Sequence, residues 1–463
     1  MYVADRPPVI HDERHARDLQ NPRDQGPATG TRAEYKGMLI VNPGGPGSSG
    51  VTMVKNRTID NEDLSNAYDI VGFDPRGVGQ SNPVHCLTNH EVDLLNFTEE
   101  APQTPAQEKT VVRNYGSVGK DCQAHDPNVY KWLDTASVAR DLDVLRAALH
   151  QPKVNWLGFS YGTKIGEIYA QLFPKHVGRM VLDGVVPINL TYFDETIVHA
   201  RTQELGIKDY FATCAQRPTC PFATDPAHGE AKLIALMASL RAHPIEAFNP
   251  LRGAGFVDDG YLRDVINDYT DKREGYPALD KLLTPLITRH DATPIFNDVM
   301  FGLSRTKNGV YPASTRDGDS AFFAVKCMDT PVDVSVARIA QAARTAARIN
   351  PLTGAGAVWS AAQCLNWPVR TGLPLRPFQN GGQPPILLIG SSHDFVTPLS
   401  WAVTMAKQIK SSRLLRTDNY GHTSFLEGNR CVDDTVVEYL LTGRTPGKDS
   451  SCENNEEGPV PTP

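Results

Sequence analysis

The sequence predicts an α/β protein with a mostly parallel β-sheet, helices on both faces of that sheet, and a large helical cap inserted into it. Three observations support this prediction. Short apolar runs alternate with helix-like segments in residues 1–186, a pattern typical of parallel strands joined by helices. Helical periodicity without clear strands follows in residues 187–376, and sheet-like runs return in residues 377–463. One interrupted α/β core explains this order better than three independent domains.

The first predicted strands are short apolar runs bounded by glycine, proline or aspartate. They lie at 37–42, 68–74, 154–159 and 179–183. Because each run is apolar throughout, we expect both faces of these strands to be buried. An amphipathic helix is predicted at 135–149 from the three- and four-residue spacing of its apolar side chains. Thr135 is its expected N-cap.

The remaining elements divide between the cap and the second part of the core. Residues 231–242, 261–269 and 335–349 show helical periodicity, so the cap or lid at 187–376 is expected to be mostly helical. The sheet is expected to resume with strands at 385–390 and 413–416 and helices at 399–409 and 431–441. The polar, proline-containing C-terminal end of 377–463 is predicted to be a tail.

Composition excludes several classes of partner. The chain has 53 acidic and 46 basic residues, a formal charge of −7 and no block of lysine or arginine. We therefore expect no nucleic-acid partner and no anionic membrane surface. No apolar run approaches the length of about 18 residues that a transmembrane helix needs. No signal peptide is visible in residues 1–30, which lack an apolar stretch.

The cysteines indicate disulfides or buried thiols rather than a metal site. Their number is even, and they form neither a CxxC pair nor a cluster with histidine, so no zinc is expected. Disulfides favour an extracellular location, whereas the missing signal peptide favours the cytoplasm. The cysteines are Cys86, Cys122, Cys214, Cys220, Cys327, Cys364, Cys431 and Cys452.

A GxSxG pentapeptide, GFSYG at 158–162, lies between a predicted strand and a predicted helix. This setting is typical of a sharp, strained turn that lifts a serine hydroxyl above a sheet, with flanking glycines making room for the turn. We expect Ser160 to be a nucleophile. An incidental tight turn is the alternative interpretation.

A nucleophilic serine needs a base and an orienting carboxylate. When the serine lies on a strand–turn–helix elbow, the acid and then the histidine follow it along the chain, each after a strand. His422 is the single histidine beyond Asp394, and it lies on a glycine-containing loop. Asp394 and Asp418 compete as the acid. Asp394 is preferred because only this residue directly follows a buried strand.

Backbone N–H groups are expected to stabilise the oxyanion of an acyl-transfer reaction. Tyr161, directly after the serine, is one predicted donor. The other should come from the loop PGGPGSSG at 43–50. Pro46 has no N–H, so Gly45 is the first choice and Gly44 the second. The loop lacks the endings of nucleotide-binding loops, which argues against a phosphate site.

Taken together, the strings NPGGPGSSG, YDIVGFDPRGVGQS, GFSYGT and RMVLDGVV and the late loops with Asp394 and His422 resemble α/β-hydrolases of the S33 peptidase type, specifically the tripeptidyl aminopeptidase-like subgroup. The resemblance covers most of the chain from about Lys36 onward. It implies an α/β-hydrolase fold, a triad of Ser160, Asp394 and His422, and a helical cap over the site.

The resemblance also implies disulfides between cysteines that are neighbours in sequence, and export from the cell. The chain differs from this family at its N-terminus, where the family usually has a signal peptide and an opening pair of strands. The implied pairs are Cys86 with Cys122, Cys214 with Cys220, Cys327 with Cys364, and Cys431 with Cys452.

The expected function is that of a serine hydrolase that works through an acyl-enzyme, with no metal or organic cofactor. The leading hypothesis is an exopeptidase, similar to tripeptidyl or prolyl aminopeptidases, that acts on free N-termini. A cap carboxylate would hold the substrate ammonium, since a buried unpaired charge is costly. Glu204 and Asp329 are the candidates, with Gly44 also expected at the substrate. The alternative is an esterase or small-molecule hydrolase, because esters and amides can use the same triad.

Overall fold

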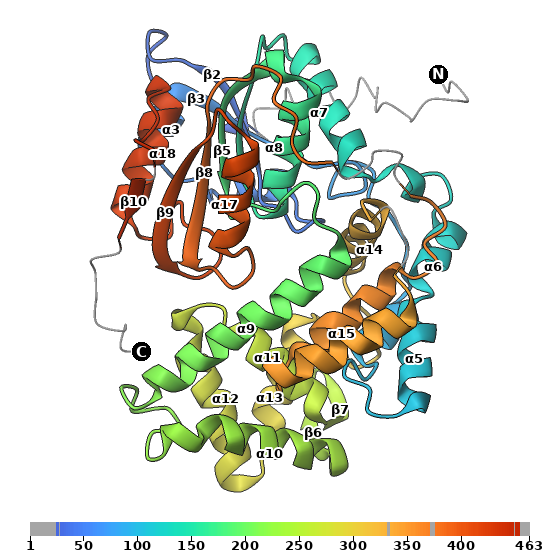
Figure 1. The fold of residues 1–463 in the computed structure, drawn as a ribbon. Coiled ribbons are helices and arrows are strands. Elements are labelled where there is room, and N and C mark those ends of the chain that lie inside the picture. The colour runs from blue at the N-terminus through green and yellow to red at the C-terminus, as the bar shows by residue number, and fades with distance from the viewer. Residues whose placement is uncertain (1–24, 27, 331–333, 371–375, 449, 454–463) are drawn as a thin grey trace.

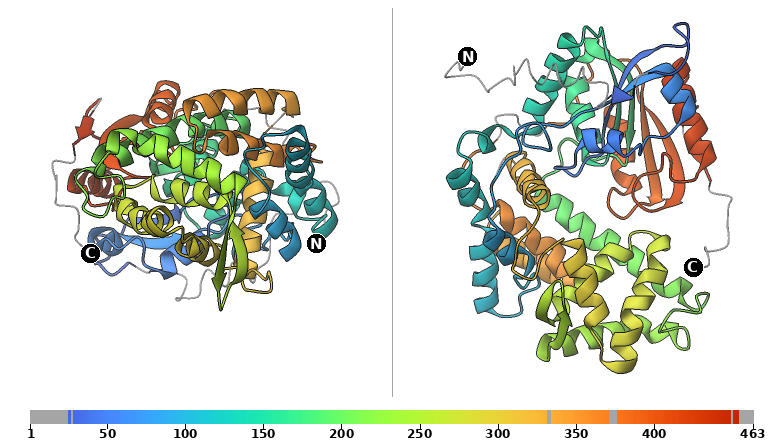
Figure 2. Two further views of the ribbon diagram at one scale, coloured as in Figure 1. Left: turned by 90° about the horizontal axis from the view of Figure 1, so that it is seen from below. Right: turned by 180° about the vertical axis from the view of Figure 1, so that it is seen from behind.

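The computed structural model describes residues 25–26, 28–330, 334–370, 376–448 and 450–453. A β-sheet flanked by helices forms one part of the molecule, and a mainly helical part lies beside one edge of it (Figure 1 and Figure 2). Within the described residues the sheet has eight strands in the order β1-β3-β2-β4-β5-β8-β9-β10. All neighbouring strands are parallel except β1, which is antiparallel to β3. The predicted parallel α/β core is therefore confirmed.

Apolar side chains on both sides of the sheet explain why its central strands are apolar throughout. Leu39 and Val41 of β2 belong to one buried cluster, and Ile40 belongs to the cluster on the opposite face. Such two-sided burial is typical of parallel sheets covered by helices. The strands are β1 (Gln25–Gly26), β2 (Gly37–Asn42), β3 (Tyr68–Gly72), β4 (Val154–Phe159), β5 (Val177–Asp183), β8 (Ile386–His393), β9 (Arg413–Tyr420) and β10 (Ser450–Cys452).

Helices cover the two faces of the sheet. Helices α3 and α18 pack on one face, and α7, α8 and α17 pack on the other (Figure 1). The helices around the sheet are α2 (Gly50–Lys55), α3 (Glu62–Ala67), α7 (Thr135–Ala148), α8 (Tyr161–Leu172), α17 (Leu399–Gln408) and α18 (Arg430–Thr442).

Four strand predictions differ from the structure. The strand expected at 179–183 begins two residues earlier, at Val177. The strand expected at 68–74 ends at Gly72. The strands expected at 385–390 and 413–416 are longer, because β8 and β9 continue to pair as far as His393 and Tyr420. Part of the predicted C-terminal tail forms β10, which pairs with β9. These differences arise from pairing between distant segments, which local composition does not report.

The predicted N-cap of the first long helix is also wrong. Helix α7 does begin at Thr135, but the cap is Asp134, whose side chain accepts a hydrogen bond from Ser137 N. The Thr135 hydroxyl lies 2.6 Å from Asp329 Oδ2 and 2.7 Å from the Tyr161 hydroxyl. Thr135 therefore links the core to the segment between β5 and β8 instead of capping its own helix.

The segment between β5 and β8 is mainly helical, as expected, but it also contains the hairpin β6–β7 (Ile245–Asn249 and Gly253–Val257). The sequence signal for this hairpin is weak, because Phe248 and Phe256 are exposed. The helices of the segment are α9 (Tyr192–Cys214), α10 (Gly229–Ala242), α11 (Asp259–Tyr269), α12 (Tyr276–Arg289), α13 (Thr293–Gly302), α14 (Ala313–Met328), α15 (Val336–Ile349) and α16 (Gly354–Trp359).

A second segment, located before Ser160 in the chain, joins this helical part. Its helices are α4 (Asn89–Asn96), α5 (Pro105–Tyr115) and α6 (Val118–His125). Helices α5 and α6 lie next to α14 and α15 (Figure 1), and α6 contacts α14. The helical part thus includes residues that the sequence assigned to the first part of the core.

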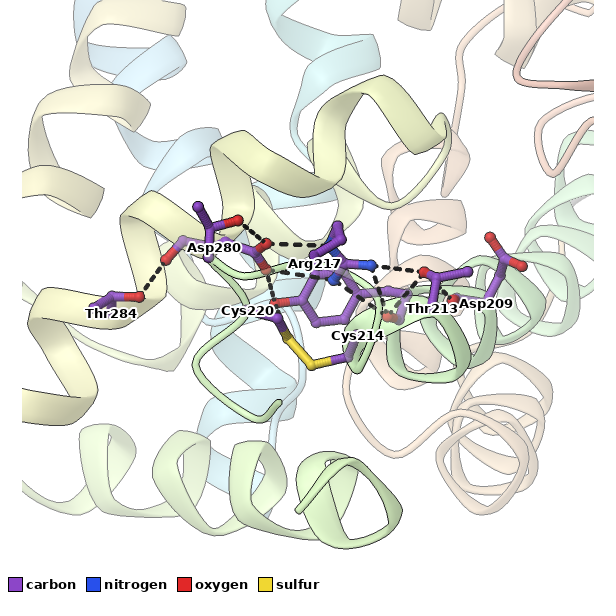
Figure 3. The surroundings of a disulfide bond; sticks show 9 residues. Asp209, Thr213, Cys214, Arg217, Cys220, Asp280 and Thr284 are labelled. Atoms are coloured by element: carbon purple, nitrogen blue, oxygen red, sulfur yellow. Dashed lines mark hydrogen bonds and ion pairs between the residues drawn. A yellow bond between two sulfur atoms is a disulfide. The ribbon is translucent and has the colours of Figure 1, made fainter. Parts of the chain in front are cut away.

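Four disulfides link the cysteines, in the same pairs that the resemblance implies. The Cys214–Cys220 bond lies beside a buried ion pair between Arg217 and Asp280 (Figure 3). Asp280 is fully buried and also accepts a hydrogen bond from the Tyr210 hydroxyl at 2.6 Å. No helix in the described ranges is both long and apolar enough to cross a bilayer.

Replacing Arg217 by alanine is expected to destabilise the protein by about 3 to 5 kcal/mol, because the variant leaves the Asp280 carboxylate buried without its cation. Equilibrium denaturation measures this change. The control is Lys232→Ala, which breaks an exposed ion pair with Asp225 in the same part of the chain and should cost less than about 1 kcal/mol. Equal losses in the two variants would contradict the prediction.

Candidate active site

Ser160 lies on a strained turn between β4 and α8. Its backbone angles are φ 52° and ψ −126°, a conformation that costs a non-glycine residue about 1 to 3 kcal/mol. The neighbouring glycines allow close packing: a Cβ on Gly158 would lie 2.5 Å from Gly162 O, and one on Gly162 would lie 2.7 Å from Asn42 O. Ser160 N donates to Asp183 O at 2.9 Å, which ties the turn to the end of β5.

His422 is hydrogen-bonded to Asp394, which is the carboxylate that the sequence analysis preferred to Asp418. His422 Nδ1 lies 3.0 Å from Asp394 Oδ2 and 3.2 Å from Oδ1. Asp394 is 2 % exposed. It also accepts hydrogen bonds from Thr397 N at 2.7 Å and Thr397 Oγ1 at 2.7 Å. A carboxylate held in this way fixes both the orientation and the tautomer of the imidazole.

The two partners shift each other's pKa in opposite directions. Burial disfavours the ionised form of Asp394, but the charge of His422 and the hydrogen bonds from His422 and Thr397 outweigh burial and lower the pKa of Asp394. Burial likewise disfavours the imidazolium of His422. The charge and hydrogen bond of Asp394, helped by Asp183 and Asp271, nevertheless raise the pKa of His422 above its ordinary value.

Ser160 and His422 both lie at the edge of the sheet where the parallel strands end. Phe159, directly before Ser160, pairs with Asp183 of β5. The next residue along β5, Gly184, lies against the imidazole, because a Cβ on Gly184 would be 3.3 Å from His422 Cε1. The structure therefore places the predicted nucleophile, acid and base after the carboxyl ends of β4, β8 and β9, which are parallel strands of one sheet.

The glycine loop after β2 lies against the Ser160 turn. A Cβ on Gly44 would be 2.9 Å from Tyr161 N and 3.0 Å from Ser160 Cβ. Gly44 N already donates to Asn42 Oδ1 at 3.0 Å. Among the hydrogen bonds of the described residues, none uses Gly45 N or Tyr161 N as the donor. The N–H group of Tyr161, directly after the serine, and that of Gly45, in the glycine loop, therefore have no acceptor among the described residues.

The two predicted ammonium-binding carboxylates are already engaged elsewhere. Asp329 is buried and pairs with Lys164 Nζ at 2.9 Å, and it also accepts from Thr135 N at 2.9 Å. Its charge is therefore balanced within the protein. Glu204 pairs with Lys208 at 3.0 Å. It lies two residues after Thr202, whose hydroxyl donates to Phe395 O, so Glu204 lies on nearly the opposite side of α9 from the Asp394 loop.

An acidic face on α11 was missed in the sequence. Asp264, Asp268 and Asp271 are spaced four and three residues apart along α11 and the turn after it. Local desolvation and the neighbouring Asp298 and Asp271 raise the pKa of Asp268 to about 6, although part of this residue is exposed to solvent. Burial also raises the pKa of Asp271, which interacts electrostatically with His422 and Asp394. The spacing is visible in the sequence, but an acidic helix face is usually solvated, so the spacing alone did not indicate a site.

Asp183 is a further residue near the site that was not predicted from the sequence. It ends a buried strand, and a position at the end of a buried strand is also what favoured Asp394. It is completely buried, and its carboxylate accepts hydrogen bonds from Ser424 N at 2.9 Å and Phe425 N at 2.8 Å. Asp183 therefore contacts the loop that carries His422.

Comparisons with known proteins point to one family. A family model described as alpha/beta hydrolase fold matches residues 37–251, and one described as TAP-like protein matches residues 350–452. The chain is 30% identical over 434 residues to a tripeptidyl aminopeptidase of Streptomyces lividans, with 92% of this chain and 78% of the relative covered.

Two mycobacterial proteins are similarly related. The serine protease Hip1 of Mycobacterium tuberculosis is 30% identical over 450 residues, covering 92% of this chain and 82% of the relative. A Mycobacterium tuberculosis protein named carboxylesterase B is 33% identical over 436 residues, covering 92% of this chain and 81% of the relative. The relatives thus include both peptidases and a named esterase.

Proposed function

Because the chain belongs to the α/β-hydrolase family of tripeptidyl-aminopeptidase-like serine hydrolases, we propose that it is an aminopeptidase that releases short peptides from free N-termini. The observation that supports this proposal most is the placement of Ser160 and of the hydrogen-bonded His422–Asp394 pair at the same edge of one parallel sheet. A serine on a strained turn, at the same sheet edge as a histidine whose pKa is raised by a buried carboxylate, fits nucleophilic catalysis.

In the proposed mechanism, Ser160 Oγ attacks the carbonyl carbon of the scissile amide while His422 accepts the hydroxyl proton. Asp394 keeps the imidazole oriented and stabilises its protonated form. The N–H groups of Gly45 and Tyr161 donate to the oxyanion. The C–N bond then breaks as His422 returns the proton to the leaving amine. Water, activated by His422, attacks the acyl-enzyme ester, releases the N-terminal fragment and restores Ser160.

We assign the recognition of the substrate ammonium to the acidic face of α11 in place of Glu204 and Asp329. Asp271 is the first candidate, because it acts electrostatically on His422; the ammonium of Lys272 also acts on Asp271, but it pairs with Glu427 at 3.2 Å. Asp268 and Asp264 continue the acidic face along the helix. A substrate ammonium placed there would gain charge-assisted hydrogen bonds, and it would offset the mutual repulsion of the carboxylates.

An esterase acting on a small molecule is the second candidate, favoured by the similarity to the protein named carboxylesterase B. The proposed triad and oxyanion donors serve an ester as well as an amide. The two functions differ in what the substrate carries away from the cleaved bond. Only the aminopeptidase requires a positively charged amino group, which would lie beside Asp271.

The test compares mono-, di- and tripeptide anilides, each with a free and with a blocked amino group, beside simple acyl esters. An aminopeptidase should cleave the free-amine anilides at least about 10-fold faster in kcat/KM than the blocked ones, because one charge-assisted hydrogen bond contributes about 1.5 to 3 kcal/mol. Asp271→Asn should reduce this preference, because it should slow the free-amine substrates more than the blocked ones. Glu204→Gln is the matched control, and its preference should equal that of the wild type. Cleavage of esters alone would reject the peptidase proposal in favour of the esterase.

The rate should depend on pH through His422. Only the neutral imidazole can accept the Ser160 proton, so kcat/KM is expected to rise with pH and to level off above the pKa of His422. Since that pKa is raised, the midpoint should lie above the ordinary histidine value of about 6.5. A pH–rate profile for a non-ionising ester measures it. A midpoint below the ordinary value would contradict the assignment of His422 as the base.

We also propose that the protein acts outside the cytoplasm. Four disulfides support an extracellular or secreted location, because reducing compartments keep most thiols unpaired. Thiol counting on protein from culture medium and from cells tests the proposal. Fully oxidised protein confined to the medium is expected, whereas reduced protein confined to the cells would overturn it.

A further inference from the structure

Asp183 carries a carboxylate that the mechanism above does not use. The residue ends β5 and is completely buried. Its Oδ2 atom accepts two backbone hydrogen bonds, from Ser424 and Phe425. Its Oδ1 atom has no hydrogen-bond partner within the described residues. A buried carboxylate with an unsatisfied oxygen lowers the stability of the folded protein unless its charge interacts favourably with another group.

The position of Asp183 connects the two reacting side chains. Its backbone carbonyl accepts from Ser160 N at 2.9 Å. Its carboxylate contacts the chain two and three residues after His422. The next residue, Gly184, lies so close to the imidazole that a Cβ there would be 3.3 Å from His422 Cε1. One residue thus contacts both the serine turn and the histidine loop.

We propose that Asp183 is a positioning residue for His422: its hydrogen bonds hold the histidine loop, and its buried charge stabilises the imidazolium that forms during the reaction. The proposal rests on the proposed function, because it assigns His422 the role of the base. Asp183 acts through His422 and contacts no substrate.

A purely structural role would not require the charge. An asparagine side-chain oxygen could accept the same two N–H groups, and it would avoid burying a carboxylate. Burial raises the pKa of Asp183 to about 6, against the two backbone hydrogen bonds that lower it. The charge of Asp183 in turn helps to raise the pKa of His422.

Other charges also face His422 and must be separated from the effect of Asp183. Asp394 approaches from the loop after β8 and Asp271 from the turn after α11. His199 of α9 interacts with His422 as a second imidazole, and its Nε2 atom lies 2.8 Å from Val396 O. A change confined to residue 183 leaves these three groups in place.

The test uses three variants of the full chain. Asp183→Asn keeps an acceptor for the loop and removes the charge, whereas Asp183→Ala removes both. Asp433→Asn is the matched control, because Asp433 Oδ1 accepts a hydrogen bond from Leu426 N of the same loop at 2.7 Å and does not act on the charge of His422. NMR of protein labelled at histidine Cε1, with His422→Gln assigning the resonance, measures the His422 titration without any substrate.

Asp183→Asn should lower the pKa of His422 and reduce kcat about 10-fold, because a tenfold change corresponds to losing about 1.4 kcal/mol of imidazolium stabilisation. Asp183→Ala should lower the pKa equally, reduce kcat further and lower the melting temperature. Asp433→Asn should leave the His422 titration unchanged. An unaltered His422 titration in a folded Asp183→Asn protein would overturn the proposal. Failure of the wild type to hydrolyse any substrate would overturn the proposed function instead, while the NMR titration would still decide the charge effect.

Discussion

Alanine in place of Ser160 is expected to lower kcat/KM for the preferred substrate by about 10⁴ to 10⁶-fold, because the reaction loses its nucleophile. Substrate binding should persist, since the proposed oxyanion donors and the proposed ammonium site on α11 remain. The rate measurement should be paired with labelling by a serine-directed fluorophosphonate, which should modify the wild type and leave the variant unlabelled. Residual activity above about 1 % of the wild-type rate would assign the nucleophile to another residue.

Glycine at position 160 provides a control for backbone strain. Ser160 has φ 52°, and glycine adopts such angles with little penalty. Ser160→Gly should therefore be as inactive as Ser160→Ala but more stable, by about 0.5 to 1 kcal/mol. Parallel thermal denaturation of the two variants measures the difference. Equal stabilities would mean that the turn stores little strain.

Changing Asp394 to asparagine is expected to lower kcat by about 10⁴-fold with little change in KM. Asparagine retains the size of the side chain, but its amide can donate to His422 Nδ1 and thereby favour the tautomer that cannot accept the Ser160 proton. The pH–rate midpoint should also fall, because the charge that raises the pKa of His422 is lost.

Asp418→Asn is the matched control for Asp394, since both aspartates competed as the triad acid in the sequence. Asp394 is hydrogen-bonded to His422, whereas the Asp418 backbone oxygen accepts a hydrogen bond from His393. We expect Asp418→Asn to retain kcat within about threefold of the wild type, as is usual for a substitution away from the reacting groups. A large loss at Asp418 with little loss at Asp394 would reverse the assignment.

Two buried ion pairs involve residues of the helical part: one joins it to the core, and the other lies between two of its own helices. Lys164 of α8 pairs with Asp329 at 2.9 Å, and Lys326 of α14 pairs with Glu195 of α9 at 2.5 Å. Buried pairs add little net stability, but removing one partner is costly. Variants at these positions therefore change the stability of the junction as well as the site, so they are poor probes of substrate binding.

Several features could be predicted because they depend on local sequence. The apolar runs located the central strands, and the strand–GxSxG–helix order located Ser160. The chain order of acid and histidine, together with the single histidine after Asp394, selected His422. The hairpin in the helical part was missed because its two phenylalanines are exposed, so its alternation of polar and apolar residues is weak. The cap carboxylates could not be predicted, because sequence does not report which charges are already paired.

The sequence by itself determined the parallel α/β core, the helical character of the inserted segment, and the residue types expected for acyl transfer. Periodicity and strand–turn–helix order are local properties of the chain, so they can be recognised in the sequence alone. Only the tertiary structure decided that Asp394 is hydrogen-bonded to His422, that Asp329 is paired with Lys164, and that Asp183 contacts the histidine loop. These outcomes depend on strand register and on packing between distant segments. The free energy of a charge is set by the neighbours that folding places beside it.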